Sequence, residues 1–405
     1  MKIKKAYKFR LKPNAEQLSQ LHHYVGACRF LWNKILAMNL DRLAAHQSLI
    51  WYHEADFWSK LWKRSEDYAF LKEVPAHCLQ QKLKDLDKAF RDAFDKTQPL
   101  KRLPNFKKRG LNDSIRFPDP KQFLIDNRRI KLPKLGWIGF VKSQNIVGDL
   151  RNATISRIAG DWYISIQVEQ EVLEPVHSSN TAIGIDVGIA HFASLSDGRS
   201  IDSPHAYRSL EKILAKAQKK LAKKKRFSQN WRKLQKRIQK LHRKIANCRH
   251  DFLNKLSTLL SKSHALIVLE DLKISNMSKS AKGSIDAPGT NVKAKSGLNK
   301  SILDQGWGEF KRQLEYKLDW LGGILVKVNP KHTSQRCNVC GHTEKGNRLS
   351  QSEFKCLACG HLENADINAA KNILAAGHAV LACGETGLPD SMKQEPLGMG
   401  NLVPA

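Results

Sequence analysis

Two pairs of cysteines in the last quarter of the chain have the spacing of a zinc site. Cys337 and Cys340 form one C-x-x-C knuckle, Cys356 and Cys359 form a second, and fifteen residues separate the two pairs. Four thiolates bind zinc tetrahedrally and leave no open position for a reacting group. The pattern therefore predicts one structural Zn²⁺, whose binding is coupled to the folding of the surrounding loop.

Three carboxylates lie at positions where the sequence predicts buried or structured backbone, so each needs a compensating partner or a function. Asp186 interrupts the apolar run AIGIDVG, Glu270 ends the run IVLE, and Asp366 falls in the first turn of a predicted helix that Asn364 would cap. A lone buried carboxylate costs several kcal/mol unless a cation or a hydrogen-bond network compensates it. Taken singly, Asp186 is also compatible with a satisfied structural role, and Asp366 with a helix-dipole role. Asp271 follows Glu270 and points to the opposite face of a pleated strand.

Taken together, the three carboxylates predict metal-dependent phosphodiester chemistry. Two-metal cleavage needs several carboxylates that converge on ions about 4 Å apart. Mg²⁺ prefers such oxygen ligands and takes few of them from the protein. Two strands and a helix that supply Asp186, Glu270 and Asp366 are the pattern of an RNase H-like site with, we expect, two Mg²⁺ ions.

The charge of the chain indicates a polyanionic partner. Its 405 residues include 69 Lys and Arg against 38 Asp and Glu, a net charge of +31. Nucleic acid is the favoured partner, because neutralising phosphates releases counterions, and an anionic membrane surface is the alternative. No apolar run reaches the roughly 20 residues of a membrane-spanning helix, and the N-terminal MKIKKAYKFRLKP has no apolar signal core. The few scattered cysteines fit a reducing compartment.

The elements that must position these groups change character along the chain. Residues 1–12 alternate like a strand, and Asn14 with Gln17 resembles a capping box that opens a helix. Helical periodicity continues to about Phe94, with aromatic residues for which core packing is favoured over base stacking: Trp51, Trp58, Trp62, Phe70 and Phe90. From Ser114 short alternating strands predict a small barrel or sandwich, which the first strand would join.

The second half of the chain predicts strands, a basic helical pair and a loop. TAIGIDVGIAHFASLSDGRSI reads as a hairpin, and ALIVLED as a buried strand. Residues 211–250 hold sixteen Lys and Arg, and a seven-residue apolar repeat predicts an antiparallel helical pair. Its basic faces either contact nucleic acid or are merely solvated. The candidate contacts are Lys223, Lys224, Lys225 and Arg226. Residues 276–300 predict a mobile loop, and the tail after Gly377 a poorly ordered segment.

Several segments in order give the chain a resemblance to a known family. These are YKFRLKPNAEQ, CRFLWNKIL, GIDVGIAHFA, LEDLKISNM, DQGWGEFKRQLEYK, and TSQRCNVCGH through KCLACGH to NADINAAKNIL. The chain resembles TnpB, a family of transposon-encoded RNA-guided nucleases related to type V CRISPR effectors. The resemblance spans most of the chain. It implies the catalytic triad Asp186, Glu270 and Asp366, and a zinc insertion held by the four cysteines.

The resemblance also implies an α/β and β multidomain architecture. An RNase H-like (RuvC) nuclease domain with a zinc-ribbon-like insertion would follow an N-terminal β-barrel wedge domain that carries a helical recognition insertion. The expected bounds are 1–13 and 111–175 for the wedge, 14–110 for recognition, 181–331 and 363–380 for the nuclease, 332–362 for the zinc insertion and 381–405 for a disordered tail.

The expected function is RNA-guided cleavage of double-stranded DNA beside a short transposon-adjacent motif. The guide RNA would derive from the right end of the transposon, with base pairing reading the sequence. The expected location is the cytoplasm of a prokaryote, at the nucleoid when DNA is bound, with no membrane partner. Two alternatives stay open: a nuclease-inactive RNA-guided repressor, against which the intact carboxylates argue, and a guide-independent transposase.

Overall fold

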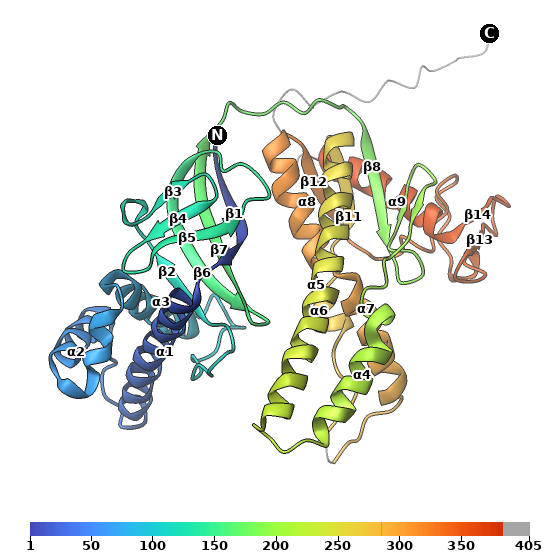
Figure 1. The fold of residues 1–405 in the computed structure, drawn as a ribbon. Helices are drawn as coiled ribbons and strands as arrows, with labels where there is room; N and C mark the ends of the chain where they lie inside the picture. The colour runs from blue at the N-terminus through green and yellow to red at the C-terminus, as the bar shows by residue number, and fades with distance from the viewer. Residues whose placement is uncertain (285, 384–405) are drawn as a thin grey trace, which may run out of the picture. The chain divides into compact units, whose positions relative to one another are not determined.

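The computed structural model describes residues 1–284 and 286–383, which divide into two compact units. The first unit is Met1–Leu173 and the second begins at Glu174. Each is considered by itself (Figure 1). Within the described part of the chain, each helix is too short or too polar to cross a lipid bilayer.

The first unit contains a seven-stranded antiparallel sheet. Its strands are β1 (Lys2–Lys12), β2 (Ser114–Phe117), β3 (Leu124–Asp126), β4 (Arg129–Leu132), β5 (Gly136–Val141), β6 (Asp149–Ile158) and β7 (Asp161–Glu171), in the order β2-β6-β7-β1-β5-β4-β3. β1 pairs with β7 from Lys2–Glu171 to Arg10–Tyr163, so the first strand does join the later ones. Ala159 and Gly160, both at positive φ, form the tight β6–β7 turn. No pair in the described residues joins β2 to β3 and closes the sheet.

Helices occupy the stretch of sequence between β1 and β2. They are α1 (Ala15–Ala44), α2 (Tyr52–Arg64), the 3₁₀ helix η1 (Glu66–Glu73) and α3 (Ala76–Phe94). A short 3₁₀ helix, η2 (Pro120–Gln122), follows β2. The predicted capping box is confirmed, because Asn14 accepts from the backbone N–H of Gln17 and the Gln17 side chain accepts from that of Asn14. Trp62 and Phe90 are buried, as the core interpretation of the aromatic residues requires, whereas Trp51 remains partly exposed under the Arg91 guanidinium.

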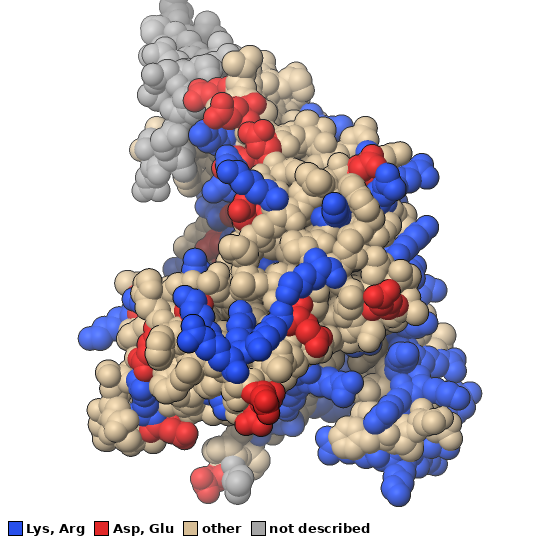
Figure 2. Space-filling model, turned by 60° about the vertical axis from the view of Figure 1, so that its left-hand side comes forward, with Lys and Arg blue, Asp and Glu red and all other residues tan. Residues whose placement is uncertain are grey.

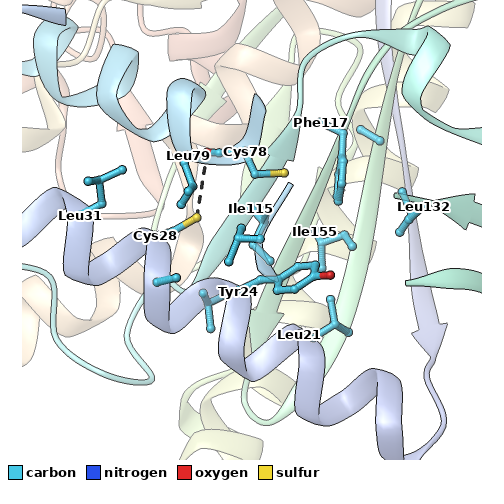
Figure 3. Packing of buried hydrophobic residues seen from close by; sticks show 14 of the residues in the cluster. Leu21, Tyr24, Cys28, Leu31, Cys78, Leu79, Ile115, Phe117, Leu132 and Ile155 are labelled. Atoms are coloured by element: carbon cyan, nitrogen blue, oxygen red, sulfur yellow. Dashed lines mark hydrogen bonds between the residues drawn. The ribbon is translucent and has the colours of Figure 1, made fainter. Parts of the chain in front are cut away.

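Figure 3 shows how α1 and α3 share one core with the sheet. Cys28 of α1 faces the carbonyl oxygen of Cys78 in α3, 4.0 Å away, and Ile115 and Ile155 come from β2 and β6. Burial raises the pKa of the Cys28 thiol to about 11. A neutral, buried thiol is inert, so Cys28 and Cys78 are packing residues.

The second unit is built on a five-stranded sheet. Its strands are β8 (Ala182–Val187), β9 (Ala193–Leu195), β10 (Ser200–Ile201), β11 (Leu266–Glu270) and β12 (Ile324–Val328), in the order β10-β9-β8-β11-β12. β8, β11 and β12 run parallel to one another, and β9 and β10 are antiparallel. The predicted hairpin and the predicted buried strand are both present.

Helices cover the two faces of this sheet. α5 (Gln229–Ser263) and α8 (Trp307–Leu321) pack on the face that presents Ile185 and Leu269. α9 (Ala365–Ala382) packs on the opposite face, against Val268 and Val326. α4 (Arg208–Ala222) returns along α5, with Leu214 against Ile245, and confirms the predicted antiparallel pair.

Two sequence predictions were wrong in this unit. The predicted loop 276–300 contains the end of α6 (Ile274–Met277) and most of α7 (Val292–Gln305). Buried Asp304 holds α7 in place, because it accepts from the Arg249 guanidinium at 2.7 Å and from the backbone N–H of Tyr207. The tail predicted to lose order after Gly377 continues α9 to Ala382, since its alanines favour helix. Residues 384–405, where the disordered tail was expected, lie outside the described residues.

Candidate active site

The sheet places Asp186 and Glu270 beside each other on one face. β8 and β11 are in parallel register, with Ile185 opposite Leu269, so the next residue of each strand is the carboxylate. Ile185 and Leu269 face α5 and α8. Because side chains alternate along a strand, Asp186 and Glu270 face α9. Asp271 points the other way, as predicted, and accepts from Lys311 of α8 at 2.5 Å.

Close packing of α9 brings the third carboxylate to the same place. A Cβ at Gly184 of β8 would overlap the carbonyl oxygen of Ala370, and a Cβ at Gly377 would overlap the side chain of Val268 in β11. Only glycine permits this approach of helix to sheet. Asn364 caps α9 by accepting from the N–H groups of Asp366 and Ile367, which fixes Asp366 in the first turn.

The charges of the other two carboxylates act on Asp186. Desolvation, followed by the charges of Glu270 and Asp366, raises the pKa of Asp186 to about 8. Desolvation also raises the pKa of Glu270, against a hydrogen bond from Thr333 that lowers it. Groups that repel one another's ionised forms in this way are suited to a shared cation, which relieves the repulsion.

An arginine and a threonine from the cysteine-bearing segment reach into this site. The guanidinium of Arg348 donates to Asp366 Oδ1 at 2.9 Å and to the carbonyl of Gln351 at 2.8 Å. Thr333 Oγ1 donates to Glu270 Oε1 at 2.5 Å. A guanidinium here adds a fixed positive charge that a phosphate oxygen can also use.

The four cysteine sulfurs gather as predicted for a zinc site. The Sγ atoms of Cys337, Cys340, Cys356 and Cys359 all lie within 4.8 Å of one another, and in the described residues this is the one group of its kind. The donor set fits Zn²⁺, because four thiolates at such separations form a closed tetrahedron. The three carboxylates do not form so compact a group in the described residues. Their oxygen donors suit Mg²⁺, which keeps several water ligands.

The two knuckles have the same backbone geometry. The N–H of Cys337 donates to the carbonyl of His342, and the N–H of Cys356 donates to that of His361, both at 2.9 Å. Gly341 and Gly360 turn each knuckle at φ of 77° and 72°, a conformation that favours glycine. Between the knuckles lie η3 (Lys345–Asn347) and β13 (Glu353–Lys355), and β14 (Leu362–Asn364), which follows the second knuckle, pairs with β13.

Asparagines of α9 tie the first knuckle to the helix that carries Asp366. Buried Asn368 accepts from the N–H of Asn338 at 3.0 Å and donates to the carbonyl of Arg336 at 2.8 Å. Asn372 donates to the same carbonyl and to that of Thr333. The cysteine cluster thus supports Asp366 through α9 and Glu270 through Thr333.

Comparisons with known proteins show which family this chain belongs to. Three family models match: OrfB_IS605, described as "Probable transposase", over residues 165–281, "Cas12f1-like, TNB domain" over 307–373, and "Helix-turn-helix domain" over 1–48, where this chain has β1 and α1. The protein named "Putative RNA-guided DNA endonuclease InsQ" from Escherichia coli (strain K12) is 49% identical over 402 residues, 98% of this chain and 99% of that protein. The chain belongs to the TnpB family.

A second relative supports the same membership along the whole chain. The protein named "Putative RNA-guided DNA endonuclease" from Streptomyces pristinaespiralis is 32% identical over 97% of this TnpB-family chain and 96% of its own length. Among solved structures, the "Cas12f1-sgRNA-target DNA complex" matches with a TM-score of 0.34 at 17% identity, covering 92% of this chain and 99% of that one.

In this TnpB-family chain, the structure gathers the four cysteines and places Glu270 and Asp366 near enough to Asp186 for their charges to act on it. It leaves Lys223, Lys224, Lys225 and Arg226 elsewhere, exposed in the turn between α4 and α5. Sequence reasoning missed the contact of Arg348 with Asp366, which joins residues 18 positions apart. It also missed Thr333 and Gly184, since no local pattern marks either residue.

Proposed function

We propose that this chain is an RNA-guided DNA endonuclease of a transposable element. It cleaves double-stranded DNA beside a short transposon-adjacent motif by metal-dependent phosphodiester hydrolysis. The observation that carries the proposal is the convergence of Asp186, Glu270 and Asp366 at one edge of the second sheet. The names of two relatives that align along nearly the whole chain support the same activity.

The three carboxylates would hold Mg²⁺, and the ions, when bound, supply an activated water and stabilise the charge on the leaving oxygen. The rest of the chemistry belongs to the chain itself. Asp186 must lose its proton before it can bind a cation, because burial and its neighbours keep it neutral. Thr333 orients Glu270 through the 2.5 Å hydrogen bond, and Arg348 is placed to contact a phosphate oxygen once a cation takes over Asp366.

The domain assignment is part of the same proposal. Residues 181–331 and 363–380 make an RNase H-like (RuvC) nuclease domain, which the parallel strands β8, β11 and β12 and the helix α9 support. Residues 332–362 form its zinc insertion, with one structural Zn²⁺. Residues 1–13 and 111–175 form the wedge domain, and 14–110 the recognition domain.

Surface charge supports a nucleic-acid partner, and the resemblance to the TnpB family implies which nucleic acids these are. Lys and Arg side chains spread over the face shown in Figure 2, where Asp and Glu are fewer, in keeping with the net charge of +31. Such a surface binds phosphates and releases counterions. The partners are a guide RNA from the transposon right end and the target DNA, in the cytoplasm of a prokaryote and at its nucleoid.

Single substitutions in the triad test the proposal. The protein is purified from cells that express the transposon end, and the RNA that accompanies it is sequenced. Asp186→Ala, Glu270→Ala and Asp366→Ala should each abolish cleavage of a matched DNA in Mg²⁺ while RNA binding is retained, because each removes charge from the metal site. Asp271→Ala, on the opposite face, should still cut.

Full cleavage by any one alanine variant would remove that residue from the triad. A wild-type protein that binds RNA and matched DNA without cutting would support a repressor instead. Cutting without any bound RNA would support a guide-independent transposase.

A further inference from the structure

The turn between α4 and α5 exposes an aromatic ring in the most basic part of the chain. We call residues 223–232 the hairpin tip. Phe227 is 61% exposed at this tip, although a phenylalanine gains by burial. Its φ of +66° is a backbone conformation that a bulky side chain rarely adopts. Strain of this kind is concentrated at functional positions.

Local packing does not account for the exposed ring. Phe227 precedes Ser228, which caps α5 by accepting from the N–H of Trp231. The ring therefore has the N′ place of a hydrophobic staple, but the N4 residue that it would pack against is Arg232. It touches Trp231 only at an edge, with ring centroids 5.4 Å apart at 61°. The guanidinium of Arg226 lies over Phe227 at 5.0 Å. A staple buries its ring, whereas most of this one faces solvent.

The residues around the ring carry positive charges that no nearby acidic side chain of the described chain neutralises. Residues 212–240 contain thirteen Lys and Arg and no Asp or Glu, and none of these thirteen cations forms an ion pair in this described segment. A surface groove of about 630 Å³ lies beside the tip. Its cationic lining consists of Lys220, Lys223, Lys224, Lys233 and Arg237. Like charges this dense repel one another unless phosphates neutralise them.

We propose that the hairpin tip binds an unpaired stretch of RNA, with the Phe227 ring stacked on a base and the flanking lysines on the adjacent phosphates. Aromatic rings among cations are the means by which proteins hold single strands without reading their sequence. A double helix hides the faces of its bases, so the exposed ring favours an unpaired segment.

The distance of the tip from the three carboxylates favours RNA, rather than the DNA strand that is cut, as the ligand of the tip. α5 reaches the core at Leu253, and the 24 helical steps from Gln229 to Leu253 span about 36 Å at the rise of an α-helix. A strand held at the tip therefore lies far from the three carboxylates. This inference rests on the proposed function, in which the guide RNA stays bound while DNA is cut.

Photochemical crosslinking to the full-length protein locates the site. The probe is an oligouridine RNA of about 12 nucleotides, a length within the usual site size, that carries one 5-iodouridine. Trypsin cuts after Arg226 and Arg232. The adduct is expected on the peptide from Phe227 to Arg232, and adducts confined to other peptides would overturn the proposal.

Affinity measurements then separate stacking from folding. Phe227→Leu keeps an apolar side chain but loses the flat ring, and it should weaken binding of the oligouridine about tenfold, the loss expected when a base loses its stacking partner. Its salt slope should equal that of the wild type, because no charge is removed. Phe227→Tyr should bind normally. Phe57→Leu is the matched control, since Phe57 is also 61% exposed but lies in α2.

Each outcome points to one conclusion. Equal affinity of Phe227→Leu and wild type overturns the tip proposal, while guided cleavage by both leaves the proposed function standing. The same titration is made with an oligothymidine DNA of equal length. If Phe227→Leu loses affinity for this DNA but not for the oligouridine RNA, the assignment to RNA is overturned. A wild-type protein that neither binds RNA nor cuts DNA contradicts the proposed function itself.

Discussion

Asp186→Asn is expected to stabilise the metal-free protein while it abolishes cleavage. Desolvation and the charges of Glu270 and Asp366 raise the pKa of Asp186 from 3.8 to about 8. Between these two values the unfolded chain loses the proton and the folded chain keeps it. The folded state then binds more protons, so the free energy of unfolding falls as the pH rises from about 4 to about 8. Asparagine is neutral in both the folded and the unfolded state, so the free energy of unfolding of the Asp186→Asn variant does not fall with pH for this reason.

The size of the effect follows from the same two values. At pH 7 the ordinary pKa lies about three pH units below the pH, and each unit is worth about 1.4 kcal/mol, so the stabilisation has an upper limit of about 4 kcal/mol. Water penetration and relaxation reduce it. Half of that amount raises the Tm of a domain of this size by about 4–8 °C.

Thermal unfolding in EDTA, followed at several pH values across this window, measures the effect. The gain of Asp186→Asn should grow with pH and level off near the raised pKa. Asp271→Asn is the control: Lys311 lowers the pKa of Asp271, so this variant should lose a little stability and retain cleavage. Excess Mg²⁺ should stabilise the wild type more than Asp186→Asn. A variant no more stable than the wild type near neutral pH would refute the reasoning.

Three further predictions concern the supports of the site and the basic turn. Cys337→Ser should lose zinc in elemental analysis and weaken cleavage, since the knuckle holds α9; a protein without zinc that still cuts would contradict this. Gly184→Ala should lower stability by about 1–3 kcal/mol in chemical unfolding and slow cleavage, because the new Cβ displaces α9, and unchanged values would show that the helix yields without cost. Replacing the basic turn by alanine should lower the slope of RNA affinity against salt by up to roughly 0.7–0.9 for each phosphate that is no longer neutralised, whereas parallel salt lines of equal affinity would mean a solvated face. The residues replaced are Lys223, Lys224, Lys225 and Arg226.

Local chemistry made some elements predictable from the sequence. Asn14 and Gln17 form the capping box because both hydrogen bonds depend only on residues three apart. Asp186 and Glu270 could be placed on strands because apolar runs surround them, and alternation correctly separated Glu270 from Asp271. In these cases the determining contacts are close in sequence.

The failures came from contacts that are distant in sequence. Glycine, serine and lysine made 276–300 look like a loop, yet α7 is held by Asp304, whose partner Arg249 lies 55 residues away. Arg348 carries no local mark of its contact with Asp366, because that contact depends on how the segment between the knuckles folds back.

The packing of α9 has a consequence for how the protein is made. α9 is the last helix of the described chain, and it alone brings Asp366 to Asp186 and Glu270. Until the ribosome has released it, one face of the second sheet leaves Val268 and Val326 uncovered, and exposed apolar strands invite aggregation. A truncated product that lacks α9 would therefore be prone to aggregate and unable to cut DNA. Because α9 is synthesised late, nuclease activity can arise only after the cysteine-bearing segment and α9 have both folded.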